Sequence, residues 1–169
     1  MKKILYLAFV AIAALAMNAC KSNSEPTPPD EQKQDTTKVE SIKGSITTPA
    51  WTNPEGYDMT SSMTAIVKVD LAQSFSADQL VEGGYQPSTS DKLAAFDATG
   101  NCLGVAEQTD GLYFLYITAP ENDSQVAIRY YSVTLKNIFI STKTFAFRND
   151  DNLGTVAEPY APTFEVDKK

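Results

Sequence analysis

The sequence predicts an all-β fold, specifically an antiparallel β-sandwich of immunoglobulin-like size. Short runs rich in branched and aromatic residues alternate with clusters of Gly, Asn, Asp and Pro, a pattern typical of consecutive antiparallel strands. About eight such runs follow one another, and no amphipathic helix of normal length is present to cover a single sheet. Because each sheet must bury its apolar face, two sheets are expected to cover each other. A small closed barrel is the alternative architecture.

The chain begins with a predicted secretory leader at residues 1–19. Lys2 and Lys3 precede an apolar stretch that is too short to span a membrane. The leader ends in Met17-Asn18-Ala19-Cys20, which resembles a bacterial lipobox, although Met and Asn depart from the usual residues. We therefore expect Cys20 to carry a lipid. The alternative is a plain signal peptide that leaves Cys20 as a terminal thiol, which would be open to oxidation outside the cytoplasm.

A polar linker is predicted to separate this anchor from the folded domain. Residues 20–38 contain three prolines and no aromatic residue, so they cannot bury enough apolar surface to offset the entropy of ordering. We expect them to be disordered. The β-sandwich domain is predicted to span residues 39–169.

The domain is predicted to start with an extended arm or a short strand at residues 39–49. Residues 62–71 then place apolar side chains at the odd positions, with only Ile66 breaking the alternation of a half-buried strand. A single helical turn that begins at Ser76 is expected in the connection that follows. The stretch 91–131 is predicted to be a β-meander. Its strands and the later ones are expected at 91–96, 102–106, 112–117, 126–131, 136–142 (with Ile138 and Ile140 on one face), 144–148 and 163–166.

Composition excludes several classes of function. The chain has no histidine, which removes Ser-His-Asp and Cys-His catalytic arrangements and His-containing zinc sites. The formal charge is −7, and without Lys2 and Lys3 it would be −9. Such an acidic protein repels phosphate backbones, so nucleic acid is not an expected partner. If Cys20 is lipidated, Cys102 has no disulfide partner and is expected to be a small buried apolar side chain.

Several short sequence motifs follow one another along the domain: Trp51, Tyr57, Ser62-Met63-Thr64-Ala65, Asp91-Lys92-Leu93-Ala94-Ala95-Phe96, Cys102-Leu103-Gly104-Val105-Ala106, Tyr113-Phe114-Leu115, Arg129-Tyr130-Tyr131 and Leu153-Gly154. In this order they resemble a β-sandwich module of exported Bacteroidetes proteins and lipoproteins, and the resemblance covers about two thirds of the chain. The resemblance implies a secreted or cell-envelope β-module, but no known ligand. Leu103 stands where such modules commonly carry Arg, so a role that depends on a cation there is not expected.

Aromatic residues in predicted loops are the candidate ligand-binding residues. Trp51, Tyr57 and Tyr85 could stack on the apolar faces of sugars. The alternative is that these loops fold over the open end of the sandwich and plug its core. Polar neighbours that could accept hydrogen bonds from sugar hydroxyls are Asn53, Glu55 and Asp58.

A candidate metal site lies near the end of the chain. Asn149, Asp150, Asp151 and Asn152 offer oxygen ligands of the kind that Ca²⁺ prefers, and Gly154 permits a sharp turn. The spacing is not that of an EF-hand, and the alternative is a solvated turn. No other cofactor is expected.

These observations lead to three functional hypotheses. The first is a non-catalytic module, lipid-anchored in the cell envelope at the outer membrane, that binds an extracellular glycan or surface protein. The second is a structural or assembly subunit, such as an adhesin component, whose sheet edge accepts a strand from a partner. The third is a hydrolase that uses carboxylates alone, for which Asp91, Asp97 and Glu107 are the candidates. The sequence does not bring two of these carboxylates together.

Overall fold

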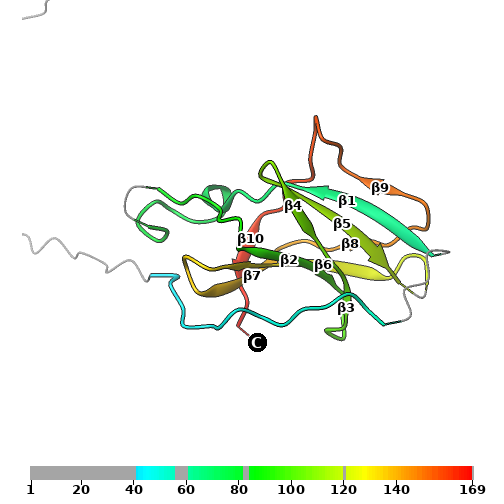
Figure 1. Cartoon of the computed structure of the whole chain (residues 1–169), viewed down its shortest axis with the longest axis horizontal. Coiled ribbons are helices and arrows are strands. Elements are labelled where there is room, and N and C mark those ends of the chain that lie inside the picture. The colour runs from blue at the N-terminus through cyan, green and yellow to red at the C-terminus, as the bar shows by residue number, and fades with distance from the viewer. Residues whose placement is uncertain (1–40, 56–60, 82–83, 120, 169) are drawn as a thin grey trace, which may run out of the picture. The chain divides into compact units, whose positions relative to one another are not determined.

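The computed structural model describes residues 41–55, 61–81, 84–119 and 121–168 (Figure 1). All the described residues belong to one compact unit. The predicted leader, Cys20 and residues 20–38 lie outside the described residues. No α-helix occurs in the part of the chain that the structure describes.

Two sheets pack face to face, which confirms the predicted all-β sandwich. Sheet A has the strand order β4-β5-β1-β9, and sheet B has the order β10-β7-β6-β2-β3, with β8 paired to β6. All pairings are antiparallel except that of β1 with β9. The strands are β1 (Ser62–Val67), β2 (Lys92–Phe96), β3 (Cys102–Val105), β4 (Glu107–Thr109), β5 (Leu112–Thr118), β6 (Gln125–Ser132), β7 (Asn137–Ser141), β8 (Phe145–Ala146), β9 (Asn152–Leu153) and β10 (Phe164–Val166).

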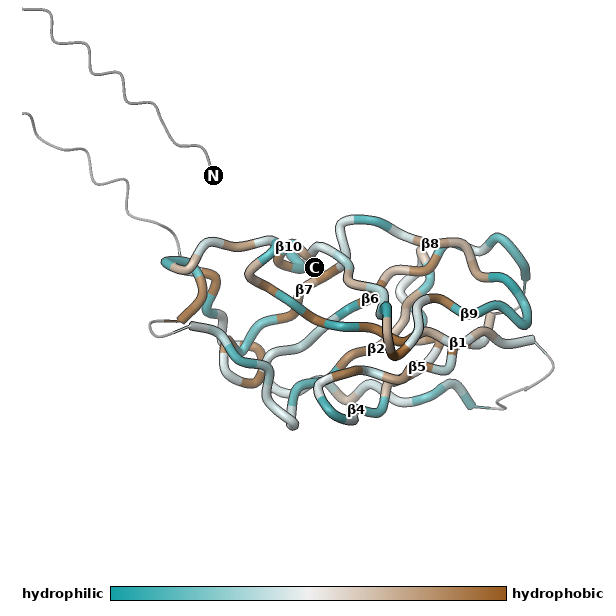
Figure 2. The backbone as a smooth tube through the Cα atoms, turned by 90° about the horizontal axis from the view of Figure 1, so that it is seen from above, coloured by the Kyte–Doolittle hydropathy of each residue, from teal (hydrophilic) through white to brown (hydrophobic). Residues whose placement is uncertain are grey.

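Alternate positions of the strands build the core between the sheets. In β1, Met63, Ala65 and Val67 are buried, as the alternation predicts. In β7 the core residue is Phe139, which packs edge-on against Phe75. The face of β7 that carries the two isoleucines is therefore the outer one. In Figure 2 the hydrophobic parts of the tube lie along strands such as β2, whereas the turn beside β9 is hydrophilic.

The stretch 91–131 does not form one continuous meander. β2 and β3 are antiparallel neighbours in sheet B, but the chain then crosses at Ala106 to sheet A and continues as β4 and β5. It returns to sheet B as β6, which pairs with β2. The prediction of a meander is wrong because turn signals define each hairpin locally, whereas the sheet in which a hairpin pairs is set by long-range packing.

A glycine allows the two sheets to approach at this crossing. β3 passes so close to β5 that a Cβ atom on Gly104 would overlap the backbone carbonyl oxygen of Tyr116. The Thr118 hydroxyl also reaches the Leu103 carbonyl oxygen, at 3.4 Å. The backbones of the two sheets are therefore in close contact along this edge.

The extended arm predicted for residues 39–49 lies along the outer face of sheet B, where its described part forms no strand (Figure 1). The backbone N–H groups of Gly44 and Ile46 donate to the carbonyl oxygens of Leu135 and Lys136, both at 2.9 Å. We call residues 41–54 the arm. Its hydrogen bonds attach the beginning of the domain to the turn between β6 and β7.

The arm also covers apolar side chains on that outer face. Trp51 packs edge-on against Phe96, with 5.4 Å between the ring centroids. The Arg129 guanidinium lies over the same Phe96 ring, 4.5 Å from its centroid, and pairs with the Asp167 carboxylate. Phe96 is consequently buried, although it points away from the core between the sheets.

Two short turns lie in the connection from β1 to β2. A 3₁₀ turn, η1 (Leu71–Gln73), is capped by the Asp70 carboxylate and was not predicted. The single helical turn at Ser76 is confirmed, since the Leu80 N–H donates to the Ser76 carbonyl oxygen at 3.2 Å. The Ser76 N–H in turn donates to the Gln79 side chain at 3.0 Å, as in a capping box.

A buried carboxylate gathers polar groups at one end of the core. Asp91 accepts four hydrogen bonds, from the Tyr130 hydroxyl at 2.5 Å, the Ser88 N–H at 2.7 Å, the Val133 N–H at 2.8 Å and the Tyr85 hydroxyl at 3.2 Å. The Tyr85 and Tyr130 hydroxyls also lie 2.5 Å apart. We call Asp91 and these two tyrosines the tyrosine network. It joins the connection after η1 to the start of β2 and to the end of β6.

The protein is expected to lose stability at alkaline pH because of its buried tyrosines. Burial, together with the charge of Asp91, raises the pKa of Tyr113 to about 12. Burial also raises the pKa of Tyr130 and of Tyr85. The unfolded chain releases these protons at about pH 10, so this stabilisation is complete below about pH 10 and is lost as the pH rises through about 12.

A titration that follows tyrosinate absorbance and far-ultraviolet circular dichroism together tests this expectation. The buried tyrosines should ionise only as the circular dichroism signal is lost, and a Tyr113→Phe variant should shift that loss to higher pH. Ionisation of every tyrosine near pH 10 in a protein that stays folded would contradict it.

Candidate binding groove

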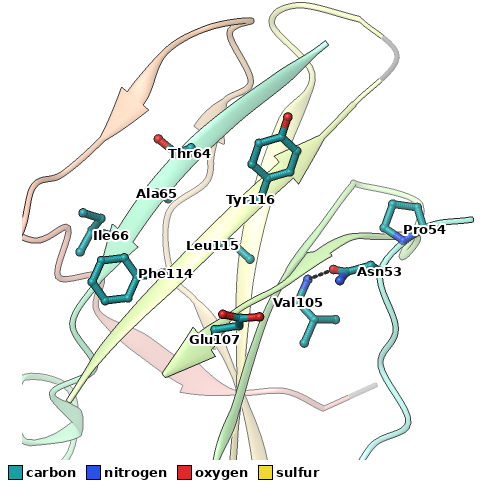
Figure 3. Close-up of a pocket in the computed structure, with 10 residues that line it drawn as sticks. All are labelled: Asn53, Pro54, Thr64, Ala65, Ile66, Val105, Glu107, Phe114, Leu115 and Tyr116. Carbon is teal, nitrogen blue, oxygen red and sulfur yellow. Dashed lines mark hydrogen bonds between the residues drawn. The ribbon is translucent and has the colours of Figure 1, made fainter. Parts of the chain in front are cut away.

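An open groove lies on the outer face of sheet A. Its volume is about 700 Å³, within the range of small-molecule binding sites. Outward side chains of β1, β4 and β5 form its floor, and the end of the arm forms one wall (Figure 3).

The register of the three strands sets the floor in two rows. Glu107 of β4, Phe114 of β5 and Ile66 of β1 are cross-strand partners and form the first row. Tyr116 and Thr64 are partners in the second row. Partners on one face of an antiparallel pair lie close enough for their side chains to interact, so each row presents a continuous surface.

The pleat of β5 turns two aromatic rings outward. Tyr113 and Leu115 are buried, and Phe114 and Tyr116 alternate with them on the outer face. Phe114 is 38% exposed and is one of two exposed large hydrophobic side chains among the described residues. The other is Val156, which does not line the groove.

The wall of the groove arises because β4 is short. β4 begins at Glu107, opposite Phe114, where the chain arrives from sheet B, so β4 does not extend beside Tyr116. Val105, Asn53 and Pro54 bound that space instead (Figure 3). The Val105 N–H donates to the Asn53 side-chain oxygen at 2.7 Å, which fixes the end of the arm against β3.

The polar groups of the groove offer both a donor and an acceptor. Glu107 is the one charged side chain among the described residues that line it, and no described residue donates to its carboxylate. Asn53 uses its oxygen for Val105, and its amide nitrogen donates to no described residue. The Tyr116 hydroxyl donates to Ser62 at 2.6 Å. The groove thus combines aromatic surface with an acceptor and a donor of hydrogen bonds.

Of the predicted loop aromatics, neither Trp51 nor Tyr85 lines this groove. Trp51 packs on the outer face of sheet B, and Tyr85 reaches into the tyrosine network, which favours the alternative that Tyr85 closes an end of the core. Tyr85 also lines a second cavity, of about 540 Å³, beside η1. Tyr57 lies outside the described residues. Of the polar neighbours named with these aromatics, Asn53 lines the groove.

The predicted calcium ligands are used for hydrogen bonds inside the protein. The Asn149 oxygen accepts from the Ser62 N–H at 2.7 Å, and an Asp151 oxygen accepts from the Asn152 N–H at 2.8 Å. The Asn152 oxygen accepts from the Thr64 hydroxyl, and an Asp150 oxygen accepts from the Asn149 amide at 3.1 Å. No cluster of three or more acidic, His or Cys side chains suited to a metal occurs among the described residues. These contacts favour a structural turn that fastens the chain before β9 to β1.

The three candidate carboxylates of a hydrolase are in different surroundings. Asp91 is buried in the tyrosine network. Asp97 accepts hydrogen bonds from Thr99 and Asn101 in the turn between β2 and β3. Glu107 is exposed in the groove. These three carboxylates therefore do not form the pair that glycoside cleavage requires.

The groove residues Phe114, Tyr116 and Ile66 were not predicted as a site. The apolar run around Phe114 resembles a strand buried on both faces, so its outward position does not show in the sequence. The sequence did hold one indication of an apolar outer face, because Ile66 is an apolar residue at a position where the alternation of β1 predicts a polar one. Only the pairing of β1 with β5 shows that these side chains share one face.

No protein-family model, no curated protein and no solved structure matches the chain. None of the described residues belongs to a helix that is long and apolar enough to cross a membrane.

Proposed function

We propose that the protein is a non-catalytic module, held in the bacterial cell envelope by a lipid on Cys20, that binds an extracellular ligand in the groove of sheet A. The observation that carries this proposal is the exposed Phe114 ring beside the Glu107 carboxylate in a groove of about 700 Å³. Surface grooves with aromatic walls and a few polar groups are the usual form of ligand sites. The similarity of the sequence to β-sandwich modules of exported Bacteroidetes proteins supports a place in the envelope.

Binding without catalysis is the activity that these residues support best. The sequence has no histidine. Asp91 and Asp97 use their oxygens for internal hydrogen bonds, and Glu107 is the single carboxylate among the described residues that line the groove. One carboxylate can accept hydrogen bonds from a ligand but cannot divide the acid and base roles of hydrolysis with a partner.

The alternative of an assembly subunit that accepts a partner's strand has less support. β9 has two residues and β10 has three, so the sheet edges that they form are short. At the edge of β3, Asn53 accepts the hydrogen bond of the Val105 N–H. Short or capped edges offer few backbone groups for an added strand.

A binding screen with matched variants tests the proposed function. The chain from residue 21 onward would be screened against arrays of glycans and of purified envelope proteins, beside Phe114→Ala and Val156→Ala variants. Val156 is 64% exposed and does not line the groove, so its variant removes exposed apolar surface elsewhere. We expect the ligand to be lost with Phe114→Ala and kept with Val156→Ala. Equal binding by all three proteins would show that the groove is not the site.

Membrane attachment is expected to depend on Cys20. With Cys20→Ser, the protein should move from the membrane fraction to the soluble fraction of the cell envelope, because the lipid has no acceptor thiol. Cys102→Ser is the matched control and should leave the fractionation unchanged. Membrane attachment of the Cys20→Ser protein at the level of the natural chain would contradict the lipid anchor.

A further inference from the structure

We propose that the ligand of the groove is a neutral glycan, with a sugar ring stacked on Phe114 and sugar hydroxyls hydrogen-bonded to Glu107 and Asn53. This inference rests on the proposed function and names the class of ligand for the same site. Three features of the groove lead to it: its exposed ring, its pair of polar groups and its charge.

The Phe114 ring is placed for stacking. It lies at the centre of the first row, between Glu107 and Ile66, and 38% of the residue is exposed. One face of a pyranose ring presents mainly C–H groups, which pack on an aromatic ring and displace water from it. A sheet strand holds the ring on a rigid element, so little ordering entropy is lost when a ligand binds.

The polar groups match the hydroxyls of a sugar. A hydroxyl can donate one hydrogen bond and accept others. The Glu107 carboxylate accepts and the Asn53 amide nitrogen donates, and neither is used by a described residue. The hydrogen bond from the Val105 N–H holds the Asn53 amide in place at 2.7 Å. The acceptor and the donor both lie on the β4 side of Phe114, with Glu107 between the ring and Asn53 (Figure 3). Each can therefore bind a hydroxyl on that side of the stacked sugar.

The charge of the groove selects against anionic glycans. Glu107 is the one charged side chain among the described lining residues, and the whole chain has a formal charge of −7. A uronate or sulfate group would meet a carboxylate with no cation in the described lining to balance it. The negative charge of such a ligand would be repelled by the Glu107 carboxylate, so a neutral sugar is the favoured ligand.

Affinity electrophoresis and calorimetry with defined polysaccharides test this inference. The chain from residue 21 onward would be run through gels that contain β-glucan, xyloglucan or galactomannan as neutral probes, and polygalacturonate or alginate as anionic probes. We expect a neutral probe to retard the protein and the anionic probes not to. Phe114→Ala should weaken binding of the neutral probe about tenfold or more, which corresponds to about 1.4 kcal/mol or more.

Further variants separate loss of the site from loss of the fold. Phe114→Tyr keeps the ring and should keep binding within about threefold, Glu107→Gln should weaken it, and Val156→Ala should leave it unchanged. Thermal unfolding of each variant establishes that it is folded.

The outcomes distinguish failure of this inference from failure of the proposed function. The protein could instead bind an anionic glycan or an envelope protein, and Phe114→Ala could abolish that binding. This result would overturn the inference of a neutral glycan and leave the groove as the binding site. If none of the neutral probes retards the protein, the inference is also overturned. Binding of a neutral probe that survives both Phe114→Ala and Glu107→Gln would overturn the inference and the proposed function together.

Discussion

Replacing Asp91 by alanine is expected to lower the free energy of unfolding by about 3–5 kcal/mol. Asp91 is buried and accepts four hydrogen bonds. Its removal leaves the N–H groups of Ser88 and Val133 and the Tyr130 hydroxyl without their acceptor. Each unpaired buried donor costs about 1–3 kcal/mol, and relaxation of the chain around the site recovers part of the sum. Urea denaturation followed by circular dichroism measures the loss.

Asp97→Ala is the matched control for this prediction. Asp97 also accepts four hydrogen bonds, from the N–H groups and side chains of Thr99 and Asn101. Those bonds lie in an exposed turn, where water can replace the lost acceptor, so we expect a cost of about 1 kcal/mol. If the two variants lost the same stability, burial would not be the reason for the effect at Asp91.

Gly104→Ala is expected to destabilise the protein by about 3 kcal/mol or more. The new methyl group would overlap the carbonyl oxygen of Tyr116, and a backbone atom can move only if β3 and β5 separate. That separation would also disturb the groove, since Tyr116 and Val105 line it. The change should therefore reduce both stability and ligand binding.

Gly100→Ala is the control that separates steric crowding at Gly104 from the backbone strain of placing alanine at a glycine position. Gly100 has a φ of +93°, and a Cβ atom there would meet nothing within 4 Å. The strain of a positive φ alone should cost about 1–2 kcal/mol. Denaturation curves for both variants test the difference. A larger loss for Gly100→Ala than for Gly104→Ala would contradict the close approach of the sheets.

The local parts of the fold could be predicted from the sequence. The alternation around Ala65 identifies β1 and its core face. The pair Asp110-Gly111, both with positive φ, forms a tight turn between β4 and β5, as an Asp-Gly pair between two strands indicates. These features depend on residues that are neighbours in the chain. β9 has only two residues, which is too short to produce a periodic pattern.

The assembly of the strands could not be predicted in the same way. The crossing of the chain between sheets at Ala106 depends on the space that Gly104 leaves for β5, and this contact joins distant segments. The parallel pairing of β1 with β9 likewise joins residues about 90 positions apart. A single sequence contains no direct signal for such contacts.

The groove was missed for the same reason. Its floor requires the register of β1, β4 and β5, and its wall requires Asn53 of the arm, so residues from four segments meet only after folding. The aromatic residues that the sequence suggested lie in loops. In the structure, Trp51 instead packs against Phe96, and the Tyr85 hydroxyl belongs to the tyrosine network.

The most direct test of the groove as the binding site is a titration of the isotope-labelled chain, followed by the shifts of its backbone amide resonances. Oligosaccharides from the neutral polysaccharides named above would be the titrants. We predict that the largest shifts lie in β1, β4 and β5, around Ile66, Glu107 and Phe114, and at Asn53 of the arm, while amides near Tyr85 stay fixed. Shifts centred on Tyr85 would contradict the assignment of the groove, and no shift with any titrant would contradict a neutral glycan as its ligand.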